Sequence, residues 1–384
     1  MRDSVTVPAN LTKIAFIDLQ AQRARIGEKR MEAAIGRVLA HGGFIMGPEV
    51  AEVERRLCAQ AGAKHVISCS SGTTALVMAL MAKKVGRGDA VFLPSFSFTA
   101  TVEPAVILGA TPVFVDVLPD TFNIDPESLE RAVAVARQAG LRPACVIAVD
   151  LFGQPADYDS IRPVAERHGF WILDDAAQSY GAHYKGKALG TCAAITATSF
   201  YPSKPLGCYG DGGAIFTDDD EIARRLAQVR VHGQGRDRNE NLRVGLTGRF
   251  DSIQAAVLLE KLAIFDAECA ERSAVAARYT AGLKGSVVTP FVRPDCTTVW
   301  AQYTVTSARR DRIAATLQAQ GIPTAIYYLK PIHTQAPYRG FPVVTGGLPV
   351  TERLAREVIS LPMHPYLTPE AQDRVIAAVR TYVA

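Results

Sequence analysis

The sequence predicts an α/β fold with a mostly parallel, mixed sheet, followed by a smaller α+β region. Between about residues 50 and 217, short apolar runs alternate with segments of helical periodicity. Several of these runs are β-branched and lack polar alternation, as expected of strands covered on both faces. After residue 252 the pattern changes to a long helical stretch, and most Pro-rich turns follow it. Strands that alternate with helices favour parallel pairing.

The alternating region provides the elements of the expected sheet. A helix comes first, because Val50, Val53, Leu57 and Ala61 fall on one face of a 3.6-residue period. The expected strands are 65–69, 90–93, 113–117, 145–149, 171–173, 195–200 and 214–217. The expected helices between them are 73–84, 99–108 and 126–139.

The later part of the chain predicts a second domain. Residues 252–282 have a helical pattern long enough to bridge two domains. A last helix opens at Thr368 and Pro369, because Thr is a good cap and Pro is tolerated in the first turn. We therefore expect a large domain over 1–251 with an N-terminal arm, a bridging stretch over 252–282, and a small α+β domain over 283–384.

Composition excludes several classes of protein. Lys plus Arg (42) barely exceed Asp plus Glu (38), and no long basic run is present, so nucleic-acid binding has no support. No apolar run reaches about 18 residues, and the first ten residues lack the apolar core of a signal peptide. The seven cysteines are scattered without a C-x-x-C pair, so we expect no metal site and a reducing compartment. The expectation is a soluble, cytoplasmic protein without a membrane segment.

Ligands of open α/β sheets bind at the carboxyl ends of the strands. After the expected strand at 65–69, the small residues of SSGTT (70–74) would expose backbone N–H groups at a helix N-terminus, which suits a phosphate. Gly72 permits close approach, and Thr73 adds a hydroxyl donor. No G-K-[ST] follows, so this is not a Walker loop. An ordinary capped turn is the alternative.

Two acids, Asp174 and Asp175, directly follow the expected strand at 171–173. Neighbouring residues of a strand point to opposite faces, so one carboxylate could reach a buried ligand while the other caps or pairs locally. An acid that only caps the next element is the alternative. In the segment 94–101, Phe96 and Phe98 could offer a flat face to a heteroaromatic ring, although core packing is the more common explanation for such residues.

Lys204 follows the expected strand at 195–200, within SFYPSKPLG (199–207), and GDGG (210–213) comes shortly after it. A Lys amine becomes a Schiff-base nucleophile when burial or a nearby cation lowers its pKa. A solvated surface charge is the alternative for this lysine taken alone.

Together these residue types match the needs of pyridoxal 5'-phosphate. A helix end holds its phosphate, an acid pairs with its ring nitrogen, an aromatic side chain covers its ring, and a Lys forms an imine with it and shuttles protons. A Rossmann dehydrogenase has no comparable support, because no G-x-G-x-x-G follows the first strand.

Over nearly its whole length the chain resembles the sugar aminotransferases of the DegT/DnrJ/EryC1/StrS family, which are fold-type I pyridoxal-phosphate enzymes. The matching segments, in order, are FIDLQ (16–20), GGFIMGPEV (42–50), SCSSGTTAL (68–76), GATPVFVDV (109–117), LFGQPAD (151–157), DDAAQSYGA (174–182), SFYPSKPLGCYGDGGAIFT (199–217), HGQ (232–234) and SLPMHPYLT (360–368). The resemblance implies a catalytic pair: Lys204 would carry the cofactor as an imine and Asp175 would pair with its pyridinium nitrogen. Dehydratases of the family have His in place of this Lys, so Lys204 implies transamination.

The resemblance also implies further cofactor contacts. Gly72, Thr73 and Ser199 would hold the phosphate. Gln178 would lie near the ring hydroxyl, and Phe98 would stack on the ring.

The family forms homodimers with shared active sites, in which the segment before the bridging helix reaches the neighbour's site. The family pattern there is G-x-N-x-R, its Asn helping to bind the partner's cofactor phosphate, but this chain has Thr247 at the Asn position. Arg249 keeps the pattern and could bind substrate anions, because its planar fork suits carboxylate or phosphate. Tyr327 and His333 lie in a segment that faces substrate in the family, and packing or surface positions remain the alternative for both.

The segment SFYPSKPLGCYGDGGA (199–214) resembles enzymes that aminate C3 of UDP-2-acetamido-2-deoxy-3-oxo-glucuronate, with L-glutamate as donor, for surface polysaccharides such as lipopolysaccharide O-antigen. The C4-aminating group tends to have Gly-Asn-Lys there. The same chemistry on a C3-keto dTDP-deoxysugar or a C4-keto UDP-sugar is one alternative. A non-catalytic regulator with this fold is another.

Overall fold

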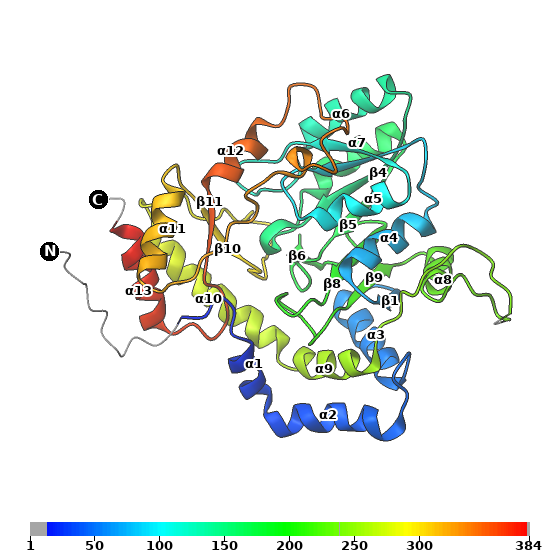
Figure 1. The fold of residues 1–384 in the computed structure, drawn as a ribbon, viewed down its shortest axis with the longest axis horizontal. Coiled ribbons are helices and arrows are strands. Elements are labelled where there is room, and N and C mark those ends of the chain that lie inside the picture. The colour runs from blue at the N-terminus through cyan, green and yellow to red at the C-terminus, as the bar shows by residue number, and fades with distance from the viewer. Residues whose placement is uncertain (1–13, 238, 382–384) are drawn as a thin grey trace.

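The computed structural model describes residues 14–237 and 239–381, and its centre is a seven-stranded sheet (Figure 1). In spatial order the strands are β1 (His65–Cys69), β9 (Gly213–Thr217), β8 (Ile195–Ser199), β5 (Trp171–Asp175), β4 (Arg142–Val149), β2 (Asp89–Pro94) and β3 (Thr111–Val115). Strand β9 pairs antiparallel with both neighbours, and every other pair is parallel. The predicted α/β class with a mostly parallel, mixed sheet is confirmed.

Helices precede, follow or connect most strands of the sheet, as parallel pairing usually requires, and within the described residues only the crossover between the parallel strands β5 and β8 has none. They are α3 (Pro48–Ala61), α4 (Gly72–Ala82), α5 (Glu103–Ile107), α6 (Pro126–Gln138), α7 (Tyr158–His168) and α8 (Asp220–Val229). The expected helix over 99–108 is instead a 3₁₀ turn, Thr99–Thr101, followed by the short helix α5. Pro104 explains the division, because proline fits only the first turn of a helix. A two-stranded hairpin of β6 (His183–Tyr184) and β7 (Lys187–Ala188) lies between β5 and β8 in sequence.

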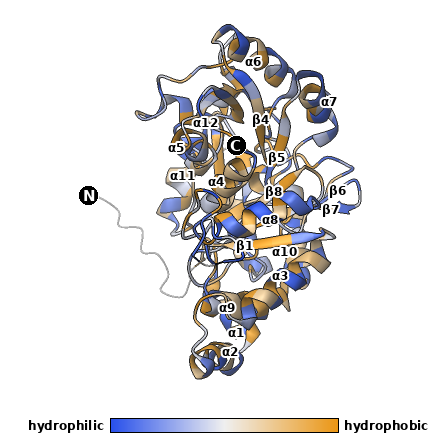
Figure 2. Ribbon diagram, turned by 90° about the vertical axis from the view of Figure 1, so that its right-hand side faces the viewer, coloured by the Kyte–Doolittle hydropathy of each residue, from blue (hydrophilic) through white to orange (hydrophobic). Residues whose placement is uncertain are grey.

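Apolar side chains cover both faces of the sheet. Successive residues of a strand point to opposite faces. Accordingly, Ile67 of β1 and Ile215 of β9 join one apolar cluster, whereas their neighbours Val66 and Phe216 join another that includes α3 and α9 (Ser252–Leu262). Figure 2 shows the apolar strands enclosed by helices with polar outer parts.

The helices before and after this sheet lie together along one side of the molecule. Helices α1 (Leu19–Ile26) and α2 (Glu28–His41) precede α3, and Ala34 and Val38 of α2 pack on Ala256 of α9. The expected stretch over 252–282 is two helices, α9 and α10 (Phe265–Leu283). Figure 1 shows α10 running from α9 toward the C-terminal elements.

The C-terminal elements surround a hydrophobic cluster of their own, to which α10 contributes Val275 and Tyr279. The elements are β10 (Tyr303–Thr306), α11 (Arg310–Ala319), β11 (Val358–Leu361) and α13 (Pro369–Arg380), whereas α12 (Pro349–Glu357) packs with Leu354 and Ala355 on the cluster of the large sheet. Thr368 caps α13 by accepting a hydrogen bond from the Ala371 N–H, as predicted. The division into domains after residues 251 and 282 stays a prediction. Within the described residues, no helix has both the length and the apolar character needed to cross a bilayer.

Candidate active site

The predicted site segments all lie at one edge of the sheet. Since only β9 runs against its neighbours, the other six strands point in one direction and end at the same edge. The segments that begin at Ser70, Ser95, Ala176 and Phe200 follow β1, β2, β5 and β8 directly. The topology therefore brings together segments that lie far apart in sequence.

Lys204 lies in a tight turn after β8, where its N–H donates to the carbonyl of Tyr201 at 2.9 Å. Gly207 is needed in this turn, because a Cβ there would lie 2.5 Å from the same carbonyl oxygen. Burial lowers the pKa of Lys204, and the opposing effect of the Asp175 charge only partly restores it. A lowered pKa increases the share of neutral amine, which is the nucleophilic and proton-accepting form.

Asp175 is buried at the end of β5. Its carboxylate accepts hydrogen bonds from the hydroxyl of Thr101 and the N–H of Ala177, both at 3.2 Å. Thr101 in turn bonds with Ser97 at 2.8 Å between hydroxyl oxygens. Burial raises the pKa of Asp175, while the Ala177 N–H, the Lys204 charge and the Thr101 hydroxyl lower it. The site thus pairs one carboxylate with one amine.

The N-terminus of α4 forms a narrow cradle. Ser71 caps the helix by accepting from the Thr74 N–H at 3.0 Å. A Cβ on Gly72 would lie 2.7 Å from the Cβ of Ser199, so only glycine permits this approach of α4 to the end of β8. Thr73 lies in the first turn of α4 and is partly exposed. Free N–H groups at a helix N-terminus beside a serine hydroxyl fit a phosphate.

The two phenylalanines after β2 have different surroundings. Phe96 is fully buried, so core packing explains it, whereas Phe98 is 56% exposed. The ring of Phe98 lies 6.3 Å from that of Tyr328, whose hydroxyl accepts from the amide nitrogen of Gln178 at 3.1 Å. The Gln178 oxygen accepts from the Phe152 N–H at 2.7 Å. Phe98 therefore offers a free face next to a glutamine held from two sides.

Two of the expected substrate residues, Tyr327 and His333, differ in how they are held. The Tyr327 ring lies 5.7 Å from the Tyr328 ring and is partly exposed. His333 is engaged elsewhere, because its Nδ1 lies 2.7 Å from the Ser95 hydroxyl and its Nε2 lies 3.7 Å from Glu352. Only Tyr327 has a ring beside the Phe98–Tyr328 group.

Thr247 and Arg249 lie in a polar concavity of about 490 Å³, together with Ser70 and Ser71. The Gly248 carbonyl between them accepts from the Ser70 N–H at 3.1 Å, which fixes this loop beside the β1–α4 turn. Thr247 is exposed, and its hydroxyl lies 3.0 Å from Nε2 of His232. Thr247 is therefore an exposed side chain whose hydroxyl is already oriented by His232.

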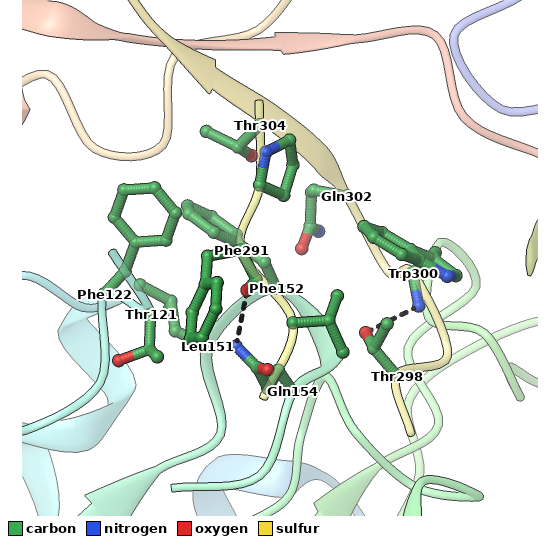
Figure 3. Close-up of a pocket in the computed structure, with 12 residues that line it drawn as sticks. Thr121, Phe122, Leu151, Phe152, Gln154, Phe291, Thr298, Trp300, Gln302 and Thr304 are labelled. Carbon is green, nitrogen blue, oxygen red and sulfur yellow. Dashed lines mark hydrogen bonds between the residues drawn. The ribbon is translucent and has the colours of Figure 1, made fainter. Parts of the chain in front are cut away.

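A second cavity lies beyond the loop that contains Phe152 (Figure 3). Phe122, Phe152 and Trp300 line it, and Gln154 anchors one wall by donating to the Phe291 carbonyl at 3.1 Å. Its volume is about 20 Å³. Sites for organic ligands usually enclose about 300–1,000 Å³, so this cavity does not hold a substrate.

The sequence did not point to three residues that contact the predicted ones: Thr101, Tyr328 and His232. Thr101 lies in the segment 94–101 that was considered, but a hydroxyl three residues after Phe98 carries no signal of its own. Tyr328 and His232 meet Gln178 and Thr247 from distant parts of the chain. Contacts of this kind depend on the tertiary fold.

Taken together, the described side chains fit pyridoxal phosphate. The cradle at Gly72 would hold its phosphate, Asp175 lies where a buried acid can face a ring nitrogen, and Lys204 is an amine close to that acid. No group of His, Cys, Asp or Glu residues in the described parts of the chain is suited to a metal ion.

Comparisons with known proteins cover nearly the whole chain. The sequence profile described as the DegT/DnrJ/EryC1/StrS aminotransferase family matches residues 25–380. The UDP-2-acetamido-2-deoxy-3-oxo-D-glucuronate aminotransferase of Pseudomonas aeruginosa is 48% identical over 372 residues, which are 96% of this chain and 99% of that protein. The dTDP-3-amino-3,4,6-trideoxy-alpha-D-glucose transaminase of Streptomyces venezuelae is 39% identical over 376 residues, or 97% of each chain.

A solved structure supports the same relationship. The crystal structure of a DegT DnrJ EryC1 StrS aminotransferase from Brucella abortus has a TM-score of 0.95 and 50% sequence identity with this chain. The match covers 97% of this chain and 100% of that one.

Proposed function

The chain belongs to the DegT/DnrJ/EryC1/StrS aminotransferase family, and from this membership we propose which sugar it aminates and which residues carry the reaction. It is a pyridoxal-phosphate-dependent aminotransferase of a nucleotide-linked keto sugar. We propose that it converts UDP-2-acetamido-2-deoxy-3-oxo-glucuronate to the 3-amino sugar, with L-glutamate as amino donor. The Pseudomonas relative with this activity supports the choice of sugar. The observation that carries the residue assignment is the buried Asp175 carboxylate beside the Lys204 amine.

Pyridoxal phosphate, when bound, supplies an electron sink and carries the amino group from donor to acceptor. In our proposal Lys204 would hold it covalently, and its Nζ would move a proton between carbon atoms. Its lowered pKa supports this role, because a base must be neutral to accept a proton. Asp175 would face the ring nitrogen and keep it protonated. The hydrogen bonds from Thr101 and Ala177 favour the charged form of Asp175 that this role needs.

The remaining residues would hold and orient the cofactor. Gly72, Thr73 and Ser199 hold the phosphate at the start of α4, where the helix dipole favours negative charge. Gln178 would lie near the ring hydroxyl, and hydrogen bonds with Phe152 and Tyr328 fix its side chain. Phe98 covers one face of the ring, and its exposure supports that assignment because the ring is free to stack.

For the substrate we propose contacts with Arg249, Tyr327 and His333. Arg249 suits an anionic group such as a uronate carboxylate or a diphosphate, and its Nε has no hydrogen-bond partner in the described part of the chain. The interaction of His333 with Ser95 makes it the weakest of the three assignments, because its Nδ1 is already engaged. Tyr327 lies next to the residue that holds Gln178.

We also propose a homodimer with shared active sites, in which the Thr247 hydroxyl binds the partner's cofactor phosphate in place of the usual Asn. The orientation of Thr247 by His232 supports this role. The seven cysteines are free of disulfides, which is consistent with work in the cytoplasm on precursors of a surface polysaccharide such as lipopolysaccharide.

Two assays test the proposal. Lys204→Ala should abolish turnover and the change in cofactor absorbance on adding glutamate, whereas Lys187→Ala, at an exposed lysine, should leave both unchanged. A Lys204→Ala protein with normal turnover would refute the assigned role. If the wild-type cofactor did not respond to glutamate, the non-catalytic regulator would be correct.

The choice of sugar is tested with a panel of keto sugars. The kcat/KM for the UDP-3-keto-uronate should be at least about 100-fold higher than the kcat/KM for a C3-keto dTDP-deoxysugar or a C4-keto UDP-sugar. A binding site that pairs the polar groups of one substrate discriminates strongly against substrates that lack them. A preference for either of the other sugars would replace the proposed substrate.

A further inference from the structure

Three carboxyl groups lie buried together at the end of β5: Asp150, Asp174 and Asp175, which are 0%, 0% and 5% exposed. Burying a charged carboxylate costs free energy unless hydrogen bonds or a cation compensate for the lost water. Only Asp175 has a place in the proposed reaction. The hydrogen bonds of the other two determine which of them is charged.

Asp150 has the contacts of an anion. Its Oδ1 accepts from the Ala156 N–H at 2.7 Å and from the Tyr158 hydroxyl at 2.8 Å, and its Oδ2 accepts from the Ser179 hydroxyl at 2.9 Å. Three donors directed at one carboxylate are the usual arrangement for a buried negative charge. Burial raises the pKa of Asp150 to about 7, but these three donors oppose that effect and favour its charged form, which makes Asp150 the charged member of the pair.

Asp174 has the opposite surroundings. Its Oδ2 accepts one hydrogen bond, from the Thr196 hydroxyl at 2.9 Å, and its Oδ1 accepts none from the described residues. The titratable groups that face it are Asp150, Asp175, Tyr158 of α7 and Cys192 of the loop before β8. None of these can carry a positive charge. Among the described residues, none of these groups compensates for a negative charge on Asp174.

Tyr158 provides a further constraint, because its hydroxyl donates to Oδ1 of Asp150 at 2.8 Å and also interacts with the carboxyl group of Asp174. A phenol has one proton to donate. That proton is directed at Oδ1 of Asp150, so the oxygen of Tyr158 can only accept from Asp174. The contact between Tyr158 and Asp174 is favourable only if Asp174 carries a proton.

We infer that Asp174 is a neutral carboxylic acid, which donates its proton to Tyr158 while Tyr158 donates to the Asp150 carboxylate. The hydrogen-bonded unit Asp174–Tyr158–Asp150 then carries a single negative charge. Burial raises the pKa of Asp174 well above its usual range, in agreement with this arrangement.

The unit has a positioning role for the active site, and this part of the inference rests on the proposed function. Asp150 binds the Ser179 hydroxyl, and its backbone N–H donates to the Asp175 carbonyl at 3.1 Å. The unit thus joins the loop after β4, which holds Gln178 through Phe152, to the turn after β5. A neutral Asp174 also avoids a second uncompensated charge next to Asp175.

Asp174→Asn and Asp174→Ala test the inference. Asn can donate to Tyr158 and accept from Thr196 without a charge, so Asp174→Asn should keep kcat within about twofold, whereas Asp174→Ala should lose about tenfold or more. Infrared difference spectra, wild type minus Asp174→Asn, should contain the carbonyl band of a protonated carboxylic acid at neutral pH. The band is measurable with and without cofactor, so failure of the proposed function would not remove it.

Folding provides a second readout. A buried acid that stays protonated takes up a proton on folding, so the ratio of wild-type to Asp174→Asn folding constants should fall about tenfold per pH unit between about pH 5 and 8. A constant ratio, or no protonated-acid band, would overturn the inference. If Asp174→Ala does not fold, Thr196→Val replaces it. Loss of that hydroxyl should be tolerated by a neutral Asp174, and a large loss of stability would indicate an anion.

Discussion

At the scale of single residues, the charge of Asp175 depends on a hydroxyl that no motif marks. Thr101 donates to its Oδ2 and so lowers the pKa that burial raises. Thr101→Val removes this donor, so the pKa of Asp175 should rise further and the carboxylate should protonate at higher pH. We expect the acidic limb of the kcat/KM profile to move to higher pH, with about three- to tenfold less activity on that limb.

Thr101→Ser is the matched control, because it keeps the hydroxyl that donates to Asp175. It should return the acidic limb to the wild-type position. If the valine and serine variants had the same pH profile, the hydrogen bond from Thr101 would not set the charge of Asp175.

A glycine provides a steric test of the phosphate cradle. In Gly72→Ala the new Cβ would lie 2.7 Å from Cβ of Ser199, closer than two carbons can approach, so α4 or β8 must move. We expect the Kd for pyridoxal phosphate to rise about 10-fold or more, as measured by titration of cofactor absorbance. Gly36→Ala is the control, since its Cβ would meet no atom within 4 Å and helix α2 should gain about 0.5–1 kcal/mol.

At the scale of elements, one acid connects the large sheet to a C-terminal helix. Asp116, just after β3, accepts from the N–H groups of Val350 and Thr351 at the start of α12 and from the Thr351 hydroxyl. Asp116→Ala would leave these buried donors without a partner and should lower the free energy of unfolding by about 3 kcal/mol in urea titrations.

Asp219, which caps the exposed start of α8, is the comparison for Asp116. Water can replace this cap, so Asp219→Ala should cost only about 1 kcal/mol. Equal losses in the two variants would mean that Asp116 acts only as an ordinary cap.

The sequence predicted elements well where a local pattern determines them. Every expected strand of the large sheet forms, because apolar β-branched runs are needed wherever a strand is covered on both faces. The break between α9 and α10 at Ala263 and Ile264 was missed, because no Gly or Pro marks it. The apolar pattern predicts a helix from residue 99, but Thr99–Thr101 form a 3₁₀ turn, because Pro104 fits only the first turn of the helix that begins at Glu103.

At the scale of the whole molecule, the sequence predicted the types of residue in the site but not their environments. The directions of the strands explain why Gly72, Asp175 and Lys204 meet at one edge, and that follows from the α/β pattern. The tertiary fold determines how deeply each carboxylate is buried. It also determines whether a distant segment brings a cation close to it. The opposite surroundings of Asp174 and Asp175, adjacent in sequence, could not be read from the motif.

The proposed homodimer leads to a prediction about an exposed apolar loop. Phe44, Ile45 and Met46 are 47%, 51% and 37% exposed, and Ile45 lines the same concavity as Thr247. Exposed consecutive apolar side chains of this kind mark an interface. Ile45→Glu would bury a charge there, so sedimentation should show a dimer Kd at least about 30-fold weaker.

The affinity for the cofactor should depend on dimerisation. If Thr247 completes the partner's phosphate site, Ile45→Glu should lose affinity for pyridoxal phosphate at protein concentrations where it is monomeric and regain it where it dimerises. Val288→Glu is the control, because Val288 is 69% exposed and does not line the concavity that contains Thr247. It should behave as wild type in both measurements. A monomeric Ile45→Glu protein with unchanged cofactor affinity would show that each chain builds its phosphate site alone and would leave Thr247 without its proposed role.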